Sequence, residues 1–126
     1  MATKNPKNQI PKTKGSKHKA KRYSVITLFP EMITGYTNVS MLGRAQKNKL
    51  INVKTLDLRS FATDKHQKTD DRPYGGGPGM VLKAEPLLKA IDKASRNGRG
   101  AMDKKSLVIV TTPRGKQFDD AEARKI

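Results

Sequence analysis

The sequence contains no cysteine. Neither a disulfide nor a thiolate metal site can therefore form in this chain. It also has no apolar run long enough to cross a bilayer as a helix, and its first residues lack the apolar stretch of a secretory signal. We expect a soluble protein of a reducing compartment, the cytoplasm, with no membrane partner.

Acidic residues are missing from positions 1–22, which carry seven Lys and one Arg. The rest of the chain carries 19 basic and 11 acidic side chains, so it is also basic, and the net charge of the chain is +16. A basic tail has many explanations, but a basic body indicates a polyanionic partner. We favour nucleic acid over a membrane surface, because no basic amphipathic helix with a large apolar face is visible.

The length of 126 residues is enough for one domain and short for two. Residues 1–22 are rich in Lys, Asn, Pro and Thr, which predicts a disordered basic arm. We expect order to begin at Tyr23, so that residues 23–126 form the folded domain.

Strands and helices are predicted to alternate along the folded domain. Apolar and β-branched runs predict strands at residues 23–29, 50–58 and 106–111, with a short extended piece at 80–82. Helices are predicted from Pro30, over residues 41–48, from near Pro86 to residues 97–98, and from near Phe118. This order predicts the α/β class, with a parallel sheet and flanking helices, whose ligands bind at the carboxyl ends of the strands.

Residues 70–80 form the most informative segment. Four glycines and two prolines fall within seven positions, 73–79, which excludes the interior of a helix or strand. The segment is neither a P-loop, which needs Lys followed by Ser or Thr, nor a dinucleotide fingerprint. A flexible surface loop is the alternative, but the adjoining Asp70, Asp71, Arg72 and Tyr74 favour a binding loop.

Other candidate groups are weaker. Asp70 and Asp71 suit either acid–base chemistry or a solvated pair. His18 and His66 lack the spacing of metal ligands, so we predict no metal site. Residues 111–115 follow a predicted strand and form either an ordinary turn or one wall of a pocket for a small ligand.

Five segments, taken in order, resemble the bacterial-type tRNA (guanine-N1)-methyltransferases, which belong to the SPOUT class of knotted methyltransferases. The segments are residues 28–32 (LFPEM), 43–45 (GRA), 59–66 (RSFATDKH), 70–80 (DDRPYGGGPGM) and 112–115 (TPRG). The resemblance covers residues 23–126 and leaves only the basic arm outside it.

The resemblance implies transfer of a methyl group from S-adenosylmethionine to N1 of the guanosine next to the tRNA anticodon. It implies a cytoplasmic homodimer with its active site between subunits, and a sheet whose carboxy-terminal part is tied in a trefoil knot around the cofactor. By position, the cofactor-binding residues are Thr111, Thr112, Pro113, Arg114 and Gly115. The residues of the tRNA-binding or active-site loop are Asp70, Arg72, Tyr74, Gly75, Gly76, Gly77, Pro78 and Gly79.

The chain departs from the family pattern at three points. Arg114 replaces a usual Gln, Thr112 replaces a usual Ser, and the basic arm is extra. The sequence also stops at Ile126, before the later knot loops, the family's base aspartate and the tRNA-binding carboxy-terminal domain, so no catalytic residue is expected within it. We therefore expect a truncated, inactive amino-terminal part of the enzyme. The alternatives are a non-catalytic RNA-binding protein derived from the family, or a separate chain that supplies the missing knot.

Overall fold

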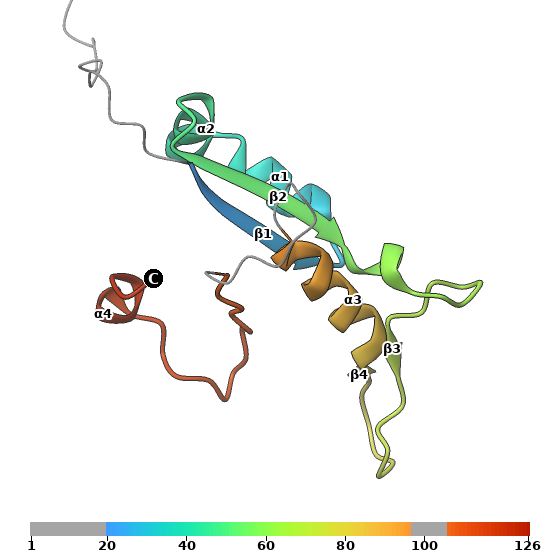
Figure 1. Ribbon diagram of the computed structural model, residues 1–126. Helices are drawn as coiled ribbons and strands as arrows, with labels where there is room; N and C mark the ends of the chain where they lie inside the picture. The colour runs from blue at the N-terminus through green and yellow to red at the C-terminus, as the bar shows by residue number, and fades with distance from the viewer. Residues whose placement is uncertain (1–19, 97–105) are drawn as a thin grey trace, which may run out of the picture. The chain divides into compact units, whose positions relative to one another are not determined.

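The computed structural model describes residues 20–96 and 106–126, which divide between Ser60 and Phe61 into two compact units (Figure 1). Most of the predicted basic arm lies outside the described residues. Its last two residues, Lys21 and Arg22, are part of the first strand, which begins two residues earlier than predicted.

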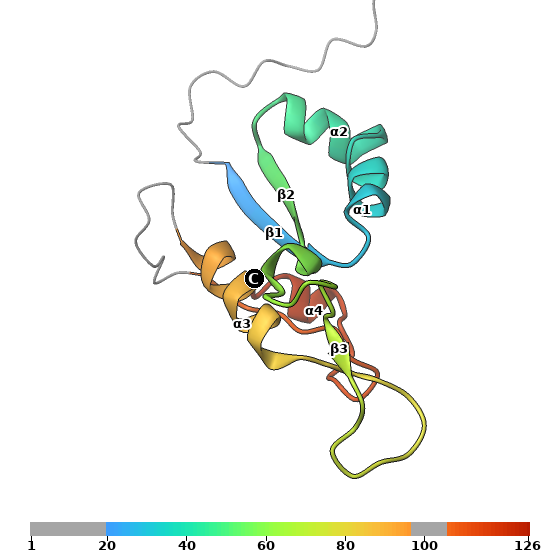
Figure 2. The ribbon, with the colours of Figure 1, turned by 90° about the vertical axis from the view of Figure 1, so that its right-hand side faces the viewer.

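The first unit is a parallel strand–helix–strand crossover. Strand β1 (Lys21–Thr27) pairs with β2 (Ile51–Asp57) in parallel, with Lys21 opposite Ile51 and Thr27 opposite Asp57. Helices α1 (Pro30–Thr37) and α2 (Ser40–Lys47) lie between them in sequence, and both contact β2. Figure 2 shows the two helices on the same side of the strand pair. The predicted α/β class, with a parallel sheet and flanking helices, is confirmed.

Local chemistry explains where these elements begin and end. Pro30 opens α1 and Glu31 lies in its first turn, where a fixed φ and a negative charge both favour a helix start. The hydroxyl of Thr27 accepts the backbone N–H of Phe29 at 3.1 Å, which ends β1 two residues earlier than predicted. Gly43 is buried in α2, and a Cβ there would lie 2.3 Å from the Asn38 carbonyl oxygen, so only glycine permits this close approach.

The second unit contains an antiparallel hairpin and a helix. Strand β3 (Asp70–Asp71) pairs with β4 (Val81–Leu82), and α3 (Ala84–Ser95) follows directly. The backbone N–H of Lys83 donates to the carbonyl of buried Thr69 at 2.8 Å, which extends the hairpin to the start of α3. The short 3-10 helix η1 (Leu58–Phe61) precedes this region, and α4 (Asp120–Ala123) is the last element.

The predicted third strand is wrong for this structure. Residues 106–110 form no strand, and the side chains of Leu107, Val108, Ile109 and Val110 are exposed. A strand needs a partner for its backbone hydrogen bonds, and no described segment pairs with these residues. Apolar composition alone therefore misled the prediction. The predicted end of α3 at residues 97–98 lies outside the described residues.

Candidate functional site

The glycine-rich segment is the loop of the β3–β4 hairpin, over residues 72–80. The Pro73 carbonyl accepts the N–H of Gly76 at 3.0 Å, which closes a β-turn at the start of the loop. Gly76 and Gly77 have φ values of +72° and +102°, and an added Cβ at either would meet no atom within 4 Å. Glycine is therefore needed here for its backbone conformation and not for space.

The charged and aromatic candidates of the β3–β4 hairpin are exposed to solvent. Asp70, Arg72 and Tyr74 are all exposed, and Tyr74 is fully so, at 107%. Asp70 and Asp71 are successive strand residues, so their side chains leave opposite faces of the hairpin. The carboxylate of Asp71 accepts the backbone N–H of Arg72 at 2.8 Å. The structure therefore does not bring the two carboxylates together as an acid–base pair.

Asp64 shapes the segment that leads into this hairpin. Both of its carboxylate oxygens accept the backbone N–H of Lys68 at 3.1 Å. This hydrogen bond lowers the pKa of the Asp64 carboxyl below its ordinary value. Gln67, just before Lys68, has φ of +50°, so the turn ending at Lys68 takes a left-handed step. The Asp64 carboxylate thus stabilises a tight turn shortly before β3.

Residues 111–115, the predicted cofactor group, form an exposed turn. The Thr112 carbonyl accepts the N–H of Gly115 at 3.2 Å, and its hydroxyl accepts the N–H of Arg114 at 3.4 Å. A Cβ at Gly115 would lie 3.1 Å from the Thr112 methyl carbon, so glycine keeps the turn narrow. No hydrogen bond joins this turn to the hairpin loop within the part of the chain that the structure describes.

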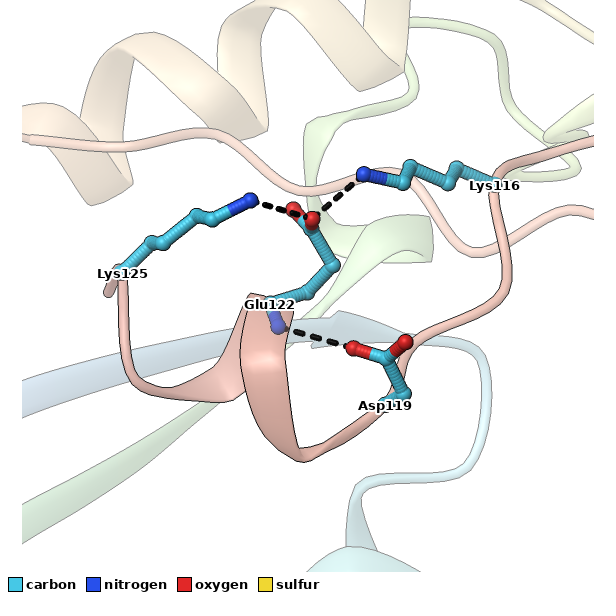
Figure 3. Close-up of polar contacts among 4 residues, drawn as sticks. All are labelled: Lys116, Asp119, Glu122 and Lys125. Carbon is cyan, nitrogen blue, oxygen red and sulfur yellow. Dashed lines mark hydrogen bonds and ion pairs between the residues drawn. The ribbon is translucent and has the colours of Figure 1, made fainter.

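Contacts between lysines and Glu122 hold α4 to Lys116, the residue that follows this turn (Figure 3). Glu122 accepts hydrogen bonds from Lys116 and, at 2.7 Å, from Lys125. The hydrogen bond from Lys116, followed by that from Lys125, lowers the pKa of Glu122. Asp119 caps the helix, because its side chain accepts the Glu122 backbone N–H at 2.8 Å.

Arg59 is a residue to which sequence reasoning gave no role. Its Nη1 donates to the Leu28 carbonyl at 2.6 Å, and its guanidinium lies 5.8 Å from the centre of the Phe29 ring. Its own backbone N–H donates to the Asp57 carboxylate at 2.9 Å. Arg59 thus ties together the carboxyl ends of β1 and β2, where parallel sheets bind ligands. The one available signal was an arginine and an aromatic residue each placed just after a strand.

Two kinds of site find no support in the described residues. No group of three or more His, Cys, Asp or Glu side chains in residues 20–96 and 106–126 is arranged to hold a metal ion. Within the same ranges, no helix has the length and apolar character needed to cross a membrane.

Comparison with known proteins identifies relatives over most of the chain. The sequence model of the family "tRNA (Guanine-1)-methyltransferase TrmD" matches residues 21–126. A tRNA (guanine-N(1)-)-methyltransferase of Clostridium acetobutylicum is 43% identical over 105 residues, which are 83% of this chain and 40% of that protein. The corresponding enzyme of Myxococcus xanthus is 46% identical over 102 residues, or 81% of this chain and 39% of that protein. The chain thus spans about 40% of the length of these curated relatives.

A solved structure agrees with these sequence relatives. The crystal structure of tRNA (m1G37) methyltransferase from Aquifex aeolicus superposes with a TM-score of 0.55 at 40% sequence identity. The match covers 59% of this chain and 33% of that one. Since the family match covers all but the first 20 residues, the chain belongs to the tRNA (guanine-1)-methyltransferase family.

Proposed function

We propose that this chain supplies the amino-terminal part of a tRNA (guanine-N1)-methyltransferase of the SPOUT class. The reaction would move a methyl group from S-adenosylmethionine to N1 of the guanosine next to the anticodon. The observation that carries the proposal is the family match over residues 21–126, which includes the whole glycine-rich hairpin. The family resemblance extends the proposal to a cytoplasmic homodimer that completes a knotted cofactor site.

The hairpin loop is the proposed contact with tRNA. Its left-handed glycines let the backbone approach a ligand closely, and its side chains offer three kinds of contact. The exposed ring of Tyr74 suits stacking on a base, and the guanidinium of Arg72 suits a phosphate. The carboxylate of Asp70 suits the N–H groups on the edge of a guanine. We assign Asp70 an orienting role.

The turn at residues 111–115 is the proposed cofactor wall. Its groups fit the polar parts of S-adenosylmethionine: the hydroxyls of Thr111 and Thr112 suit a ribose, and the Arg114 guanidinium suits a carboxylate. The narrow bend that Gly115 permits would let the ligand lie against the backbone. Bound there, the cofactor supplies an electrophilic methyl group. We assign no residue of this chain the role of the base that removes the N1 proton of the guanine.

A hybrid enzyme tests this proposal. In the hybrid, residues 21–126 replace the matching part of the Myxococcus xanthus relative, which keeps its own remaining sequence. Purified hybrid, the relative itself and the 126-residue chain are each incubated with radiolabelled S-adenosylmethionine and unmodified tRNA. The modified nucleoside is then identified by mass spectrometry.

We expect the hybrid to form N1-methylguanosine and the 126-residue chain to form none. A hybrid that folds by circular dichroism and binds tRNA but transfers no methyl group would contradict the proposal. That result would favour the non-catalytic RNA-binding alternative. Methyl transfer by the 126-residue chain alone would show that the base lies within it, and would overturn the assignment of that role to a later residue.

A further inference from the structure

The first unit carries its charges unevenly along the strands. Residues 20–60 contain seven basic and two acidic side chains. Both acidic residues lie at the carboxyl end of the strand pair: Asp57 ends β2, and Glu31 lies in the first turn of α1. The opposite end carries four exposed basic side chains, which we call the amino-end surface: Lys21, Arg44, Lys47 and Lys49.

Backbone hydrogen bonds place these residues side by side. Lys21 begins β1, and its N–H donates to the carbonyl of Leu50 at 3.1 Å, in the segment that joins α2 to β2. Arg44 and Lys47 lie in the last turn of α2, directly before that segment. Figure 1 shows the end of α2 beside the beginnings of both strands. One end of the unit therefore presents a cluster of positive charge.

Lys49 has a backbone conformation that glycine would adopt at a lower cost in free energy. Its φ is +56°, in the left-handed region. The Lys49 N–H donates to Gln46 at 2.9 Å, and the Leu50 N–H donates to Ala45 at 3.0 Å, which together close the end of α2. Glycine is the usual residue at this point of such a helix end. Favourable placement at the helix dipole accounts for Arg44 and Lys47, but a left-handed lysine costs stability and so indicates a use for its charge.

The amino-end surface lies at the opposite end of the strands from Arg59 and the expected ligand edge. We propose that the amino-end surface binds RNA phosphates.

RNA is the partner that the observations favour. The cations come from a helix end, a strand start and a short connection, whereas lipid surfaces are usually bound by a long amphipathic basic helix. The choice of RNA over other polyanions rests on the proposed function.

Salt-dependent binding tests this surface. The 126-residue chain is titrated with fluorescein-labelled unmodified tRNA, and anisotropy is measured between about 50 and 200 mM salt. The variants are Arg44→Gln, Lys47→Gln and Lys49→Gly, and Lys93→Gln in α3 is the control with the same change of charge. Each lost phosphate contact should reduce the slope of log affinity against log salt by about 0.9.

Lys49→Gly separates binding from folding. Because glycine suits the left-handed position, this variant should melt at a higher temperature than the parent and yet bind tRNA several-fold more weakly. Unchanged slopes in all three variants, or an equal loss in Lys93→Gln, would overturn the surface. If the variants lose as much binding to phosphatidylserine vesicles as they lose to tRNA, the choice of RNA as the partner is overturned. If the variants keep the parent's salt slope and the hybrid enzyme is active, the proposed surface is refuted and the proposed function stands. If the variants have a lowered salt slope and the hybrid is inactive, only the proposed function is refuted.

Discussion

At the scale of single residues, exposure separates positions that serve a ligand from positions that serve the fold. Asp70 is exposed, and its carboxylate accepts no hydrogen bond from a side chain or backbone group of the described residues. Its replacement should therefore change stability by no more than about 0.5 kcal/mol. Gly43 is buried against a backbone carbonyl, so its replacement should act on the fold.

We predict that Asp70→Ala in the hybrid enzyme lowers kcat/KM for tRNA by about 10- to 100-fold, the value of one hydrogen bond to a charged group. The melting temperature should stay near that of the parent. Gly77→Ala should also lower the rate, because an alanine at φ of +102° would distort the loop. Asp92→Ala is the control, since Asp92 is an exposed residue of α3 whose partner among the described residues is Arg96. A wild-type rate in Asp70→Ala, or its unfolding, would refute the role of the loop.

Gly43→Ala and Gly35→Ala form a matched pair in adjacent helices. A methyl group at Gly43 would overlap the Asn38 carbonyl, and we predict a loss of about 1–3 kcal/mol in unfolding free energy. A methyl group at Gly35 would meet no atom within 4 Å, so alanine should stabilise α1 by up to about 1 kcal/mol. Urea denaturation of both variants measures the difference. Equal effects would mean that the close approach at Asn38 does not constrain the fold.

At the scale of elements, short helices depend on a few polar contacts. Helix α4 spans only Asp120–Ala123, too little to be stable by its own hydrogen bonds. Glu122, with Lys116 and Lys125, and the Asp119 cap are therefore what hold it. The lowered pKa of Glu122 makes this dependence measurable.

We predict that α4 loses order in acid. A carboxyl whose pKa is lower in the folded state than in the unfolded state stabilises the fold fully above its unfolded pKa, about 4.3 for Glu. That contribution declines as the pH falls below this value and is lost through the folded pKa. Amide chemical shifts of residues 120–123, followed by NMR during acid titration, report the change. Glu122→Gln should remove most of this pH dependence, whereas Glu31→Gln in the other unit should leave it intact.

At the scale of the whole molecule, few apolar side chains of the described residues are buried. Leu58 and Ala90 are well buried, at 3% and 0% exposure, but the large apolar side chains of residues 107–110 are between 52% and 72% exposed. Such a run is typical of a strand inside a sheet, and in this chain it has no described partner. Under the proposed function, the remaining sequence of the hybrid enzyme would supply a partner strand.

We predict that amide protons of residues 107–110 exchange freely in the 126-residue chain and become protected in the hybrid enzyme. Hydrogen exchange with mass spectrometry measures both. The protection should appear because strand hydrogen bonds require a neighbour, which the remaining sequence of the relative would provide. Amides of β1 and β2 serve as the internal control, since they already pair with each other. Equal exchange of residues 107–110 in the two proteins would exclude this explanation.

The sequence by itself determined features that reside in single residues or short segments. Pro30 set the start of α1, and the glycine run set a loop at residues 72–80 with left-handed steps. These were predictable because φ preferences belong to the residue itself. The family, too, was readable from linear motifs, and the comparisons confirmed it.

Only the tertiary structure decided which segments meet. Arg59 contacts a carbonyl 31 positions earlier, and β3 and β4 pair through two residues each. The tertiary structure also places Lys21, Lys47 and Lys49 at the same end of the strand pair. It leaves residues 106–110 without a strand partner among the described residues. Pairing and charge clustering depend on a partner elsewhere in the chain, and local preference carries no record of that partner.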